Sequence, residues 1–244
     1  VDQTGSELRH WQLLGPFKLS SSIENISKEP LPDQLTHLTP TRILKPINKR
    51  DWISIESNGR IDLNAIYGVQ NNAIAYLVSV LDSDEARLQK FLLGVNDEAK
   101  VWINGKLVIE AVSPYRLIPD EFHFSSSLQK GPNICVIQIR NRLRTWDVSI
   151  QTQPSNSTLF TGNLVLPNEK PASWANASIT DAFGKSIQTS ANNMGNFTLV
   201  IPSEFQLPLT AQFRNQHYEA STTLETKDPT SFPPKTVLRS LGRI

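Results

Sequence analysis

The sequence predicts an all-β protein made of two β-sandwiches, and three observations lead to this prediction. Short apolar segments recur along the chain with Gly, Pro and Asn between them, a spacing typical of sandwich strands rather than of βαβ units. Asn104-Gly105 is a strong hairpin signal, because a two-residue type I′ turn needs positive φ at both central positions. No stretch shows the sustained 3.6-residue periodicity of a long amphipathic helix.

Residues 91–112 are the clearest part of the pattern, and we expect three short strands joined by two tight turns. An apolar strand at 91–95 is followed by the polar residues Asn96-Asp97-Glu98, which indicate a turn. In the next strand Val101 and Trp102 point to opposite faces, because side chains alternate along a strand. A three-stranded meander cannot stand alone in water, so the rest of the first half must cover it.

The other strands of the first half are predicted in chain order from the same signs, each bounded by turn-forming residues. They are residues 11–17, 52–55, 72–81, 122–124, 134–139 and 146–150. Residues 20–49 are polar and interrupted by proline, so we predict a long loop there.

The second half begins after a polar stretch. Residues 1–152 are assigned to the first domain, and 153–158 are interpreted as a linker. Residues 159–226 repeat the pattern of short strands and turns and form the second, smaller sandwich. Residues 227–244 contain few apolar side chains, and we predict a tail or the start of a link to a further domain.

Several segments of the first half resemble galactose-binding-like jelly-roll domains. LLGVNDEAK at 92–100 and VWINGKLV at 101–108 match their core, and WQLLGPF at 11–17 matches their opening strand. LQKGPNICVIQIRN at 128–141 and TWDVSI at 145–150 match their closing strands. The resemblance implies a jelly-roll module of the kind found as an accessory part of bacterial extracytoplasmic enzymes and surface proteins.

The second half resembles the carboxypeptidase regulatory-like domain, a small prealbumin-like or Ig-like sandwich. The match consists of Gly162, the strand Ala177-x-Ile179, the turn Asp181-x-x-Gly184, and Gly195-Asn196-Phe197. Such domains are usually spacers or stabilisers and carry no catalytic residues, and the resemblance implies the same here.

Composition excludes several classes of function. The net charge is +1 without a long basic run, which disfavours nucleic-acid binding driven by phosphate neutralisation. No apolar segment approaches the roughly 20 residues that span a bilayer, and no signal peptide is visible. The lone Cys135 forms no internal disulfide, and we expect it to be a small buried hydrophobe.

The search for catalytic chemistry finds no established motif. The histidines fit neither a hydrolase triad nor a zinc site. Asp82, Asp84 and Asp97 fall in predicted turns, where Asp forms local hydrogen bonds. A structural calcium ion, common in the jelly-roll family, is the alternative role for these three carboxylates. We expect no other cofactor.

Aromatic side chains give the candidate binding residues. Sugars stack their apolar faces on exposed aromatic rings while nearby polar groups bind the hydroxyls. Trp11, Trp102 and Trp146 lie in predicted strands and are expected in the core. Trp52, Tyr115 and Arg116 are the more plausible ligand contacts.

The sequence therefore predicts a non-catalytic accessory region of a larger bacterial extracytoplasmic protein, periplasmic, secreted or on the cell surface. Its expected partners are a glycan or cell-surface ligand and neighbouring domains of the same polypeptide. One alternative is a purely structural spacer or docking pair for a missing catalytic or sensor unit. The other is a divergent glycoside hydrolase, which would need two carboxyl groups in a cleft.

Overall fold

The computed structural model describes residues 8–19, 35, 38, 52–57 and 59–241. The chain divides into two compact units, Val1–Thr152 and Gln153–Ile244. Strand makes up 59% and helix 4%, which confirms the all-β prediction. Most of the loop predicted at 20–49 lies outside the described residues. Within the described part no helix is long and apolar enough to cross a membrane.

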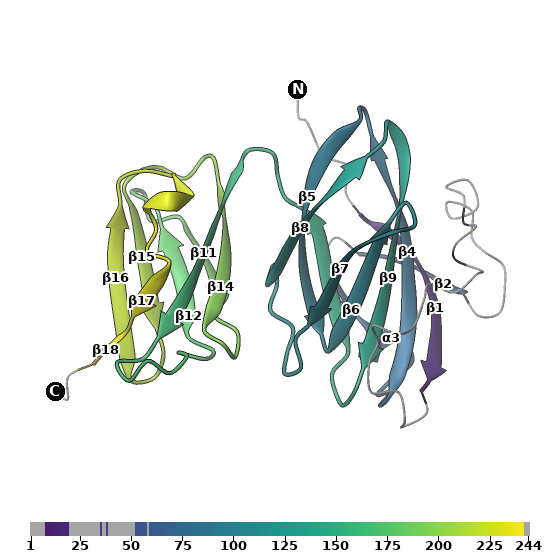
Figure 1. Ribbon diagram of the computed structural model, residues 1–244, viewed down its shortest axis with the longest axis horizontal. Helices are drawn as coiled ribbons and strands as arrows, with labels where there is room; N and C mark the ends of the chain where they lie inside the picture. Colours follow the sequence, from purple (N-terminus) through teal and green to yellow (C-terminus); the bar gives the residue numbers. More distant parts are fainter. Residues whose placement is uncertain (1–7, 20–34, 36–37, 39–51, 58, 242–244) are drawn as a thin grey trace. The chain divides into compact units, whose positions relative to one another are not determined.

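Unit 1 is built from two antiparallel sheets (Figure 1). The six-stranded sheet has the order β2-β1-β4-β9-β6-β7, and the four-stranded sheet has the order β3-β10-β5-β8. One short helix, α3 (Leu63–Tyr67), follows β3. The strands are β1 (His10–Lys18), β2 (Trp52–Glu56), β3 (Arg60–Asp62), β4 (Ala73–Ser83), β5 (Arg87–Asn96), β6 (Glu98–Ile103), β7 (Lys106–Val112), β8 (Phe122–Leu128), β9 (Gly131–Asn141) and β10 (Asp147–Thr152).

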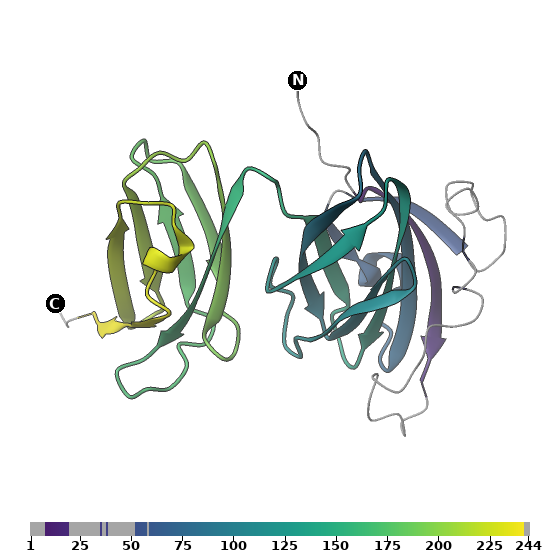
Figure 2. The same ribbon diagram turned by 45° about the horizontal axis from the view of Figure 1, so that its top comes forward.

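The core of unit 1 lies between these sheets, which face each other as two layers (Figure 2). Leu77 and Ile137 of the six-stranded sheet and Phe91 and Val148 of the four-stranded sheet are fully buried in one cluster. Burial of such side chains stabilises the fold by about 1.5–3 kcal/mol each before entropy is counted. Trp11 and Trp146 join this cluster, as predicted.

The outer face of the six-stranded sheet carries a second apolar cluster. Tyr76, Val78 and Trp102 are buried there, on the face opposite Val101, because successive side chains of a strand alternate. The predicted alternation of Val101 and Trp102 is therefore confirmed. Leu35 and Leu38, from the segment between β1 and β2, pack on the same face.

Residues 91–112 form three strands as predicted, but only one of the two junctions is a hairpin. Asn104 and Gly105 have φ of 51° and 80°, the positive values that the β6–β7 turn requires. At the other junction β5 pairs with β10 while β6 pairs with β9. Asp97 alone carries the chain from one sheet to the other. The tight polar turn predicted there is wrong, because the chain changes sheets at this point, and Asn96, Asp97 and Glu98 are buried, at 2%, 4% and 2% exposed.

Unit 2 is a second, smaller sandwich. A three-stranded sheet, β14-β11-β17, faces a five-stranded sheet, β13-β12-β15-β16-β18. Phe160 and Ile201 from the first and Ile179 and Phe213 from the second share one buried cluster. Its strands are β11 (Ser157–Val165), β12 (Asn176–Thr180), β13 (Ser186–Ser190), β14 (Asn196–Pro202), β15 (Leu209–Arg214), β16 (Tyr218–Leu224), β17 (Lys235–Val237) and β18 (Arg239–Ser240), with a 3-10 turn, η2 (Pro229–Ser231).

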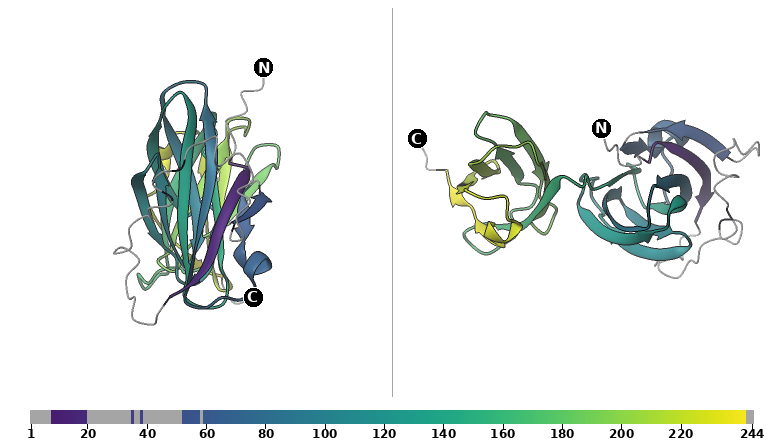
Figure 3. Two further views of the ribbon diagram at one scale, coloured as in Figure 1. Left: turned by 90° about the vertical axis from the view of Figure 1, so that its right-hand side faces the viewer. Right: turned by 90° about the horizontal axis from the view of Figure 1, so that it is seen from above.

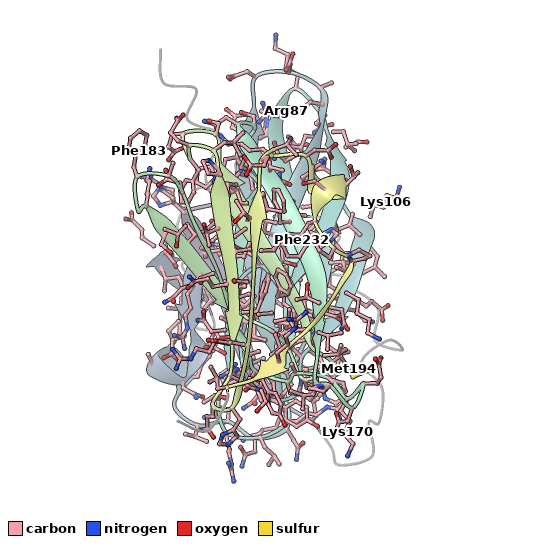
Figure 4. All side chains as sticks on the ribbon, turned by 90° about the vertical axis from the view of Figure 1, so that its left-hand side faces the viewer. Arg87, Lys106, Lys170, Phe183, Met194 and Phe232 are labelled. Carbon is pink, nitrogen blue, oxygen red and sulfur yellow. The ribbon has the colours of Figure 1, made fainter. Side chains whose placement is uncertain are left out.

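The prediction of a tail at 227–244 is wrong for residues 229–240, which belong to this sandwich. β17 pairs in parallel with β11, and β18 pairs with β16. Phe232 is 5% exposed and Leu238 is fully buried, and Phe232 packs edge-on against Phe160 in the core (Figure 4). Two apolar side chains at the right register are enough to dock an edge segment that is otherwise polar and proline-rich. The predicted linker is also shorter, because β11 begins at Ser157.

Candidate functional site

Four connections gather at one end of unit 1, and they form the candidate site. The register places them side by side: Glu98 pairs with both Arg140 and Val112, and Asp147 pairs with both Asn96 and Asp62. The connections are the α3 segment at 63–72, Asp97, the β7–β8 loop at 113–121 and the β9–β10 loop at 142–146. The two-layered sandwich is seen end-on in Figure 3.

Asp97 holds two of these loops. Its carboxylate Oδ2 accepts a hydrogen bond from the backbone N–H of Arg142 at 2.6 Å. Its backbone carbonyl accepts one from the N–H of Ser113 at 2.7 Å. The hydroxyl of Ser113 in turn donates to the carbonyl of Arg116 at 3.2 Å. The β7–β8 and β9–β10 loops are therefore both fixed to one buried residue.

Burial raises the pKa of Asp97 above its ordinary value, while the backbone N–H groups of Arg142 and Leu143 oppose that rise. A carboxylate taken out of water is costly unless donors replace the lost hydration. The donors here belong to the main chain of the β9–β10 loop. The role of Asp97 is therefore to position that loop.

Glu98, the next residue, is the anionic centre of a buried ion-pair group. Its carboxylate bonds to the guanidinium of Arg142 and lies 3.6 Å from that of Arg140. The side chain of Glu98 is 2% exposed and that of Arg142 is 49% exposed. One carboxylate between two guanidinium groups leaves a net positive charge, and the half-exposed Arg142 brings it toward the surface.

The two loops expose apolar and cationic side chains together. Tyr115 is 64% exposed and Leu143 is 62% exposed, and Arg116 and Arg144 are exposed as well. An aromatic ring beside guanidinium donors can stack on the face of a sugar ring and bind its oxygens. This arrangement can hold a ligand.

Trp52 does not belong to this group. It is the first residue of β2, an edge strand, and packs half-buried against the cluster on the outer face of the six-stranded sheet. Tyr115 and Arg116 follow β7, the strand at the opposite edge. Five strand spacings of about 4.8 Å separate β2 from β7, roughly 24 Å along the sheet. The three predicted contacts therefore do not form one site.

The three predicted metal ligands are also kept apart. Asp82 pairs with Pro132 near one end of β9, and Glu98, beside Asp97, pairs with Arg140 near the other. Eight residues at about 3.3 Å each separate these positions, roughly 26 Å. Asp82 and Asp84 are exposed, whereas Asp97 is bonded to backbone donors. In the part of the chain that the structure describes, no three His, Cys, Asp or Glu side chains gather as a metal site.

Arg142, Leu143 and Arg144 are absent from the predicted contacts. The signal is present in the sequence RNRLRTW at 140–146, which places three arginines within five residues, one at the end of a strand and two in the loop after it. Arg140 is buried, and the other two arginines flank an exposed leucine. Nothing in the local sequence shows which of the three arginines turns inward, so the sequence alone does not predict the exposed contacts.

Cys135 fits its expected role. The side chain is fully buried, and desolvation raises the pKa of its thiol to about 12. A thiol in this setting is a packing group and not a nucleophile.

Comparisons with known proteins give weak similarities. No protein-family model matches the sequence, and no curated protein shows significant similarity to it. Solved structures that resemble the chain include a β-glucuronidase of Bifidobacterium dentium complexed with coumarin-3-O-glucuronide, at 10% identity and a TM-score of 0.41, covering 92% of this chain and 49% of that one.

Two further structures are similar to the same degree. A β-glucuronidase from an uncultured Clostridium sp. has 10% identity and a TM-score of 0.40, covering 91% of this chain and 45% of that one. A β-glucuronidase from glycoside hydrolase family 2 has 13% identity and a TM-score of 0.37, covering 90% and 29%. The chain thus spans less than half the length of these structures, and similarity at this level does not identify its activity.

Proposed function

We propose that this chain is a non-catalytic β-sandwich region that binds a carbohydrate through the β7–β8 and β9–β10 loops of unit 1. The observation that carries the proposal is the attachment of both loops to Asp97. A loop that is already fixed loses little conformational entropy when a ligand binds, which favours affinity.

The buried acids of this end support a binding role over a hydrolytic one. Asp97 is bonded to the main chain, Glu98 to Arg140 and Arg142, and Asp147 to Arg60. Glycoside hydrolysis needs one carboxyl group as acid and a second as base or nucleophile on either side of the scissile bond. These three carboxyl groups are instead used to hold the fold.

The wider assignments form part of the same proposal. Unit 1 is taken as a galactose-binding-like jelly roll and unit 2 as a carboxypeptidase regulatory-like spacer, both belonging to a larger extracytoplasmic protein. The exposed Tyr115 ring is the expected stacking platform.

A glycan array followed by calorimetry on the hits tests the proposal. We expect Tyr115→Ala to weaken binding roughly two- to tenfold, because a stacked contact of an aromatic ring is worth about 0.5–1.5 kcal/mol beyond its buried area and about 1.4 kcal/mol corresponds to tenfold in affinity. Phe183→Ala is the matched control, since Phe183 is an 84% exposed aromatic residue of unit 2. It lies at the end of that unit opposite Met194 (Figure 4), and its replacement should leave affinity unchanged.

A blank array for the intact chain contradicts the proposal and favours the purely structural role. Equal losses for both variants contradict it as well, because the loss would then not depend on the loops. Circular dichroism of each variant separates a binding defect from unfolding.

A further inference from the structure

The β9–β10 loop presents Arg144 in an unusual way. Its φ is 71°, in the left-handed region that arginine rarely adopts outside glycine-like turns. Its backbone N–H donates to Asn71 Oδ1 at 3.1 Å, and its carbonyl accepts from Asn64 Nδ2 at 3.1 Å. Two side-chain amides from the α3 segment therefore fix this one residue on both sides.

The backbone of Arg144 is held by hydrogen bonds, whereas its guanidinium is exposed and within the described ranges makes no hydrogen bond or ion pair. The two neighbouring arginines, Arg140 and Arg142, both form ion pairs with Glu98. Strained backbone held by surrounding contacts is common where a side chain must be presented for binding.

Two further arginines lie on the loops of this end. Arg142 is half-exposed, and Arg116 is exposed on the β7–β8 loop that shares the Asp97 attachment. Asp147 is ion-paired with Arg60, whereas Asp62 and Asp120 accept hydrogen bonds from neutral amide groups, which do not balance a carboxylate charge. None of these three carboxylates, all in the described part of the chain, bonds to Arg144. A guanidinium binds a carboxylate or sulfate with two parallel hydrogen bonds.

We propose that the ligand of these loops is an acidic saccharide, and that Arg144 binds its anionic group. This inference rests on the proposed carbohydrate-binding function and adds the charge of the ligand to it. A carboxylate of a uronic acid and a sulfate ester offer the same chemistry to a guanidinium. Tyr115 would stack on the ring that carries the group or on its neighbour.

The test measures binding of three oligosaccharides that share one backbone: neutral, uronate-bearing and sulfated. We expect the acidic forms to bind at least tenfold more tightly than the neutral one, with affinity that falls as salt rises. The acidic form that binds more tightly identifies the anionic group.

Two variants then separate binding from folding. Arg144→Gly removes the guanidinium and also suits the positive φ, so it should bind the acidic ligand at least tenfold more weakly while its melting temperature stays the same or rises. Arg144→Gln keeps the backbone strain and loses the charge, and should show the same loss of affinity. Arg214→Gln, at an exposed arginine of unit 2, is the control and should bind normally.

The outcomes are distinct. Equal binding of neutral and acidic forms, or normal affinity in both Arg144 variants, overturns the acidic-ligand inference and leaves the proposed function standing. Absence of binding to all three oligosaccharides and to the array overturns both.

Discussion

Replacement of Asp97 separates a positioning role from a role that needs its charge. Asp97→Ala removes the acceptor for the N–H of Arg142, a bond of 2.6 Å. A partly buried donor left without an acceptor costs about 1–3 kcal/mol, so we expect the free energy of unfolding of unit 1 to fall by about 2 kcal/mol.

Asp97→Asn is expected to behave differently. Burial raises the pKa of Asp97, which means that folding is more favourable when this carboxyl group is neutral than when it is charged. The amide oxygen of Asn can still accept the Arg142 N–H without a charge to desolvate. We therefore expect Asp97→Asn to change stability at neutral pH by less than about 1 kcal/mol.

Urea unfolding and amide hydrogen exchange measure both effects. In Asp97→Ala, exchange at Ser113, Arg142 and Leu143 should accelerate more than exchange elsewhere in unit 1. Asp228→Ala serves as the control. Asp228 caps η2 in unit 2 with a comparable side-chain bond to Thr230, so its replacement should leave exchange in the loops of unit 1 unchanged. If Asp97→Ala leaves stability and loop exchange unaltered, or if Asn is as damaging as Ala, the positioning role is refuted.

Three further predictions concern the stability of the two units. Gly195→Ala should destabilise unit 2 by more than about 2 kcal/mol, because the new Cβ would lie 2.2 Å from the Leu164 carbonyl at a φ of +80°. Gly184→Ala, at a φ of +84° in open space, should cost only about 1 kcal/mol in the same urea unfolding experiment. Leu238→Ala should cost about 2–5 kcal/mol, because the side chain is fully buried; a loss below about 0.5 kcal/mol would show that residues 235–240 are a tail after all. Mild acid should affect the units in opposite directions, and hydrogen exchange followed between pH 6 and about 3 resolves them separately. Desolvation raises the pKa of three carboxyl groups in unit 1, so their uptake of protons on folding adds stability as pH falls through the raised values toward 3.8. Hydrogen bonds lower the pKa of three carboxyl groups in unit 2, and the stability that these groups contribute is lost as pH falls below their ordinary range. The groups are Asp97, Asp120 and Asp147 in unit 1, and Asp181, Glu204 and Asp228 in unit 2. Slopes of the same sign in both units would contradict this.

The strands could be predicted because each carries its own signal. Val101 and Trp102 alternate between faces by the geometry of a strand alone, and Asn104-Gly105 specifies its turn through two backbone conformations. Neither needs information from distant residues.

The candidate site could not be predicted in this way because its bonds are long-range. Asp97 resembles a turn residue until Arg142, 45 residues later, supplies a backbone donor. Trp52 and Tyr115 both looked like exposed contacts, and only the strand order places them at opposite edges. Two apolar residues, Phe232 and Leu238, are too few to predict a strand, because their burial depends on a core that other segments build.

The most direct test of the account is a two-dimensional NMR titration of the isotope-labelled chain with the acidic oligosaccharide that binds most tightly. The account predicts shift changes concentrated at residues 113–120 and 142–145, with weaker changes at Asn64 and Asn71. Changes centred on Trp52 or on unit 2, with those two loops unaffected, would contradict it.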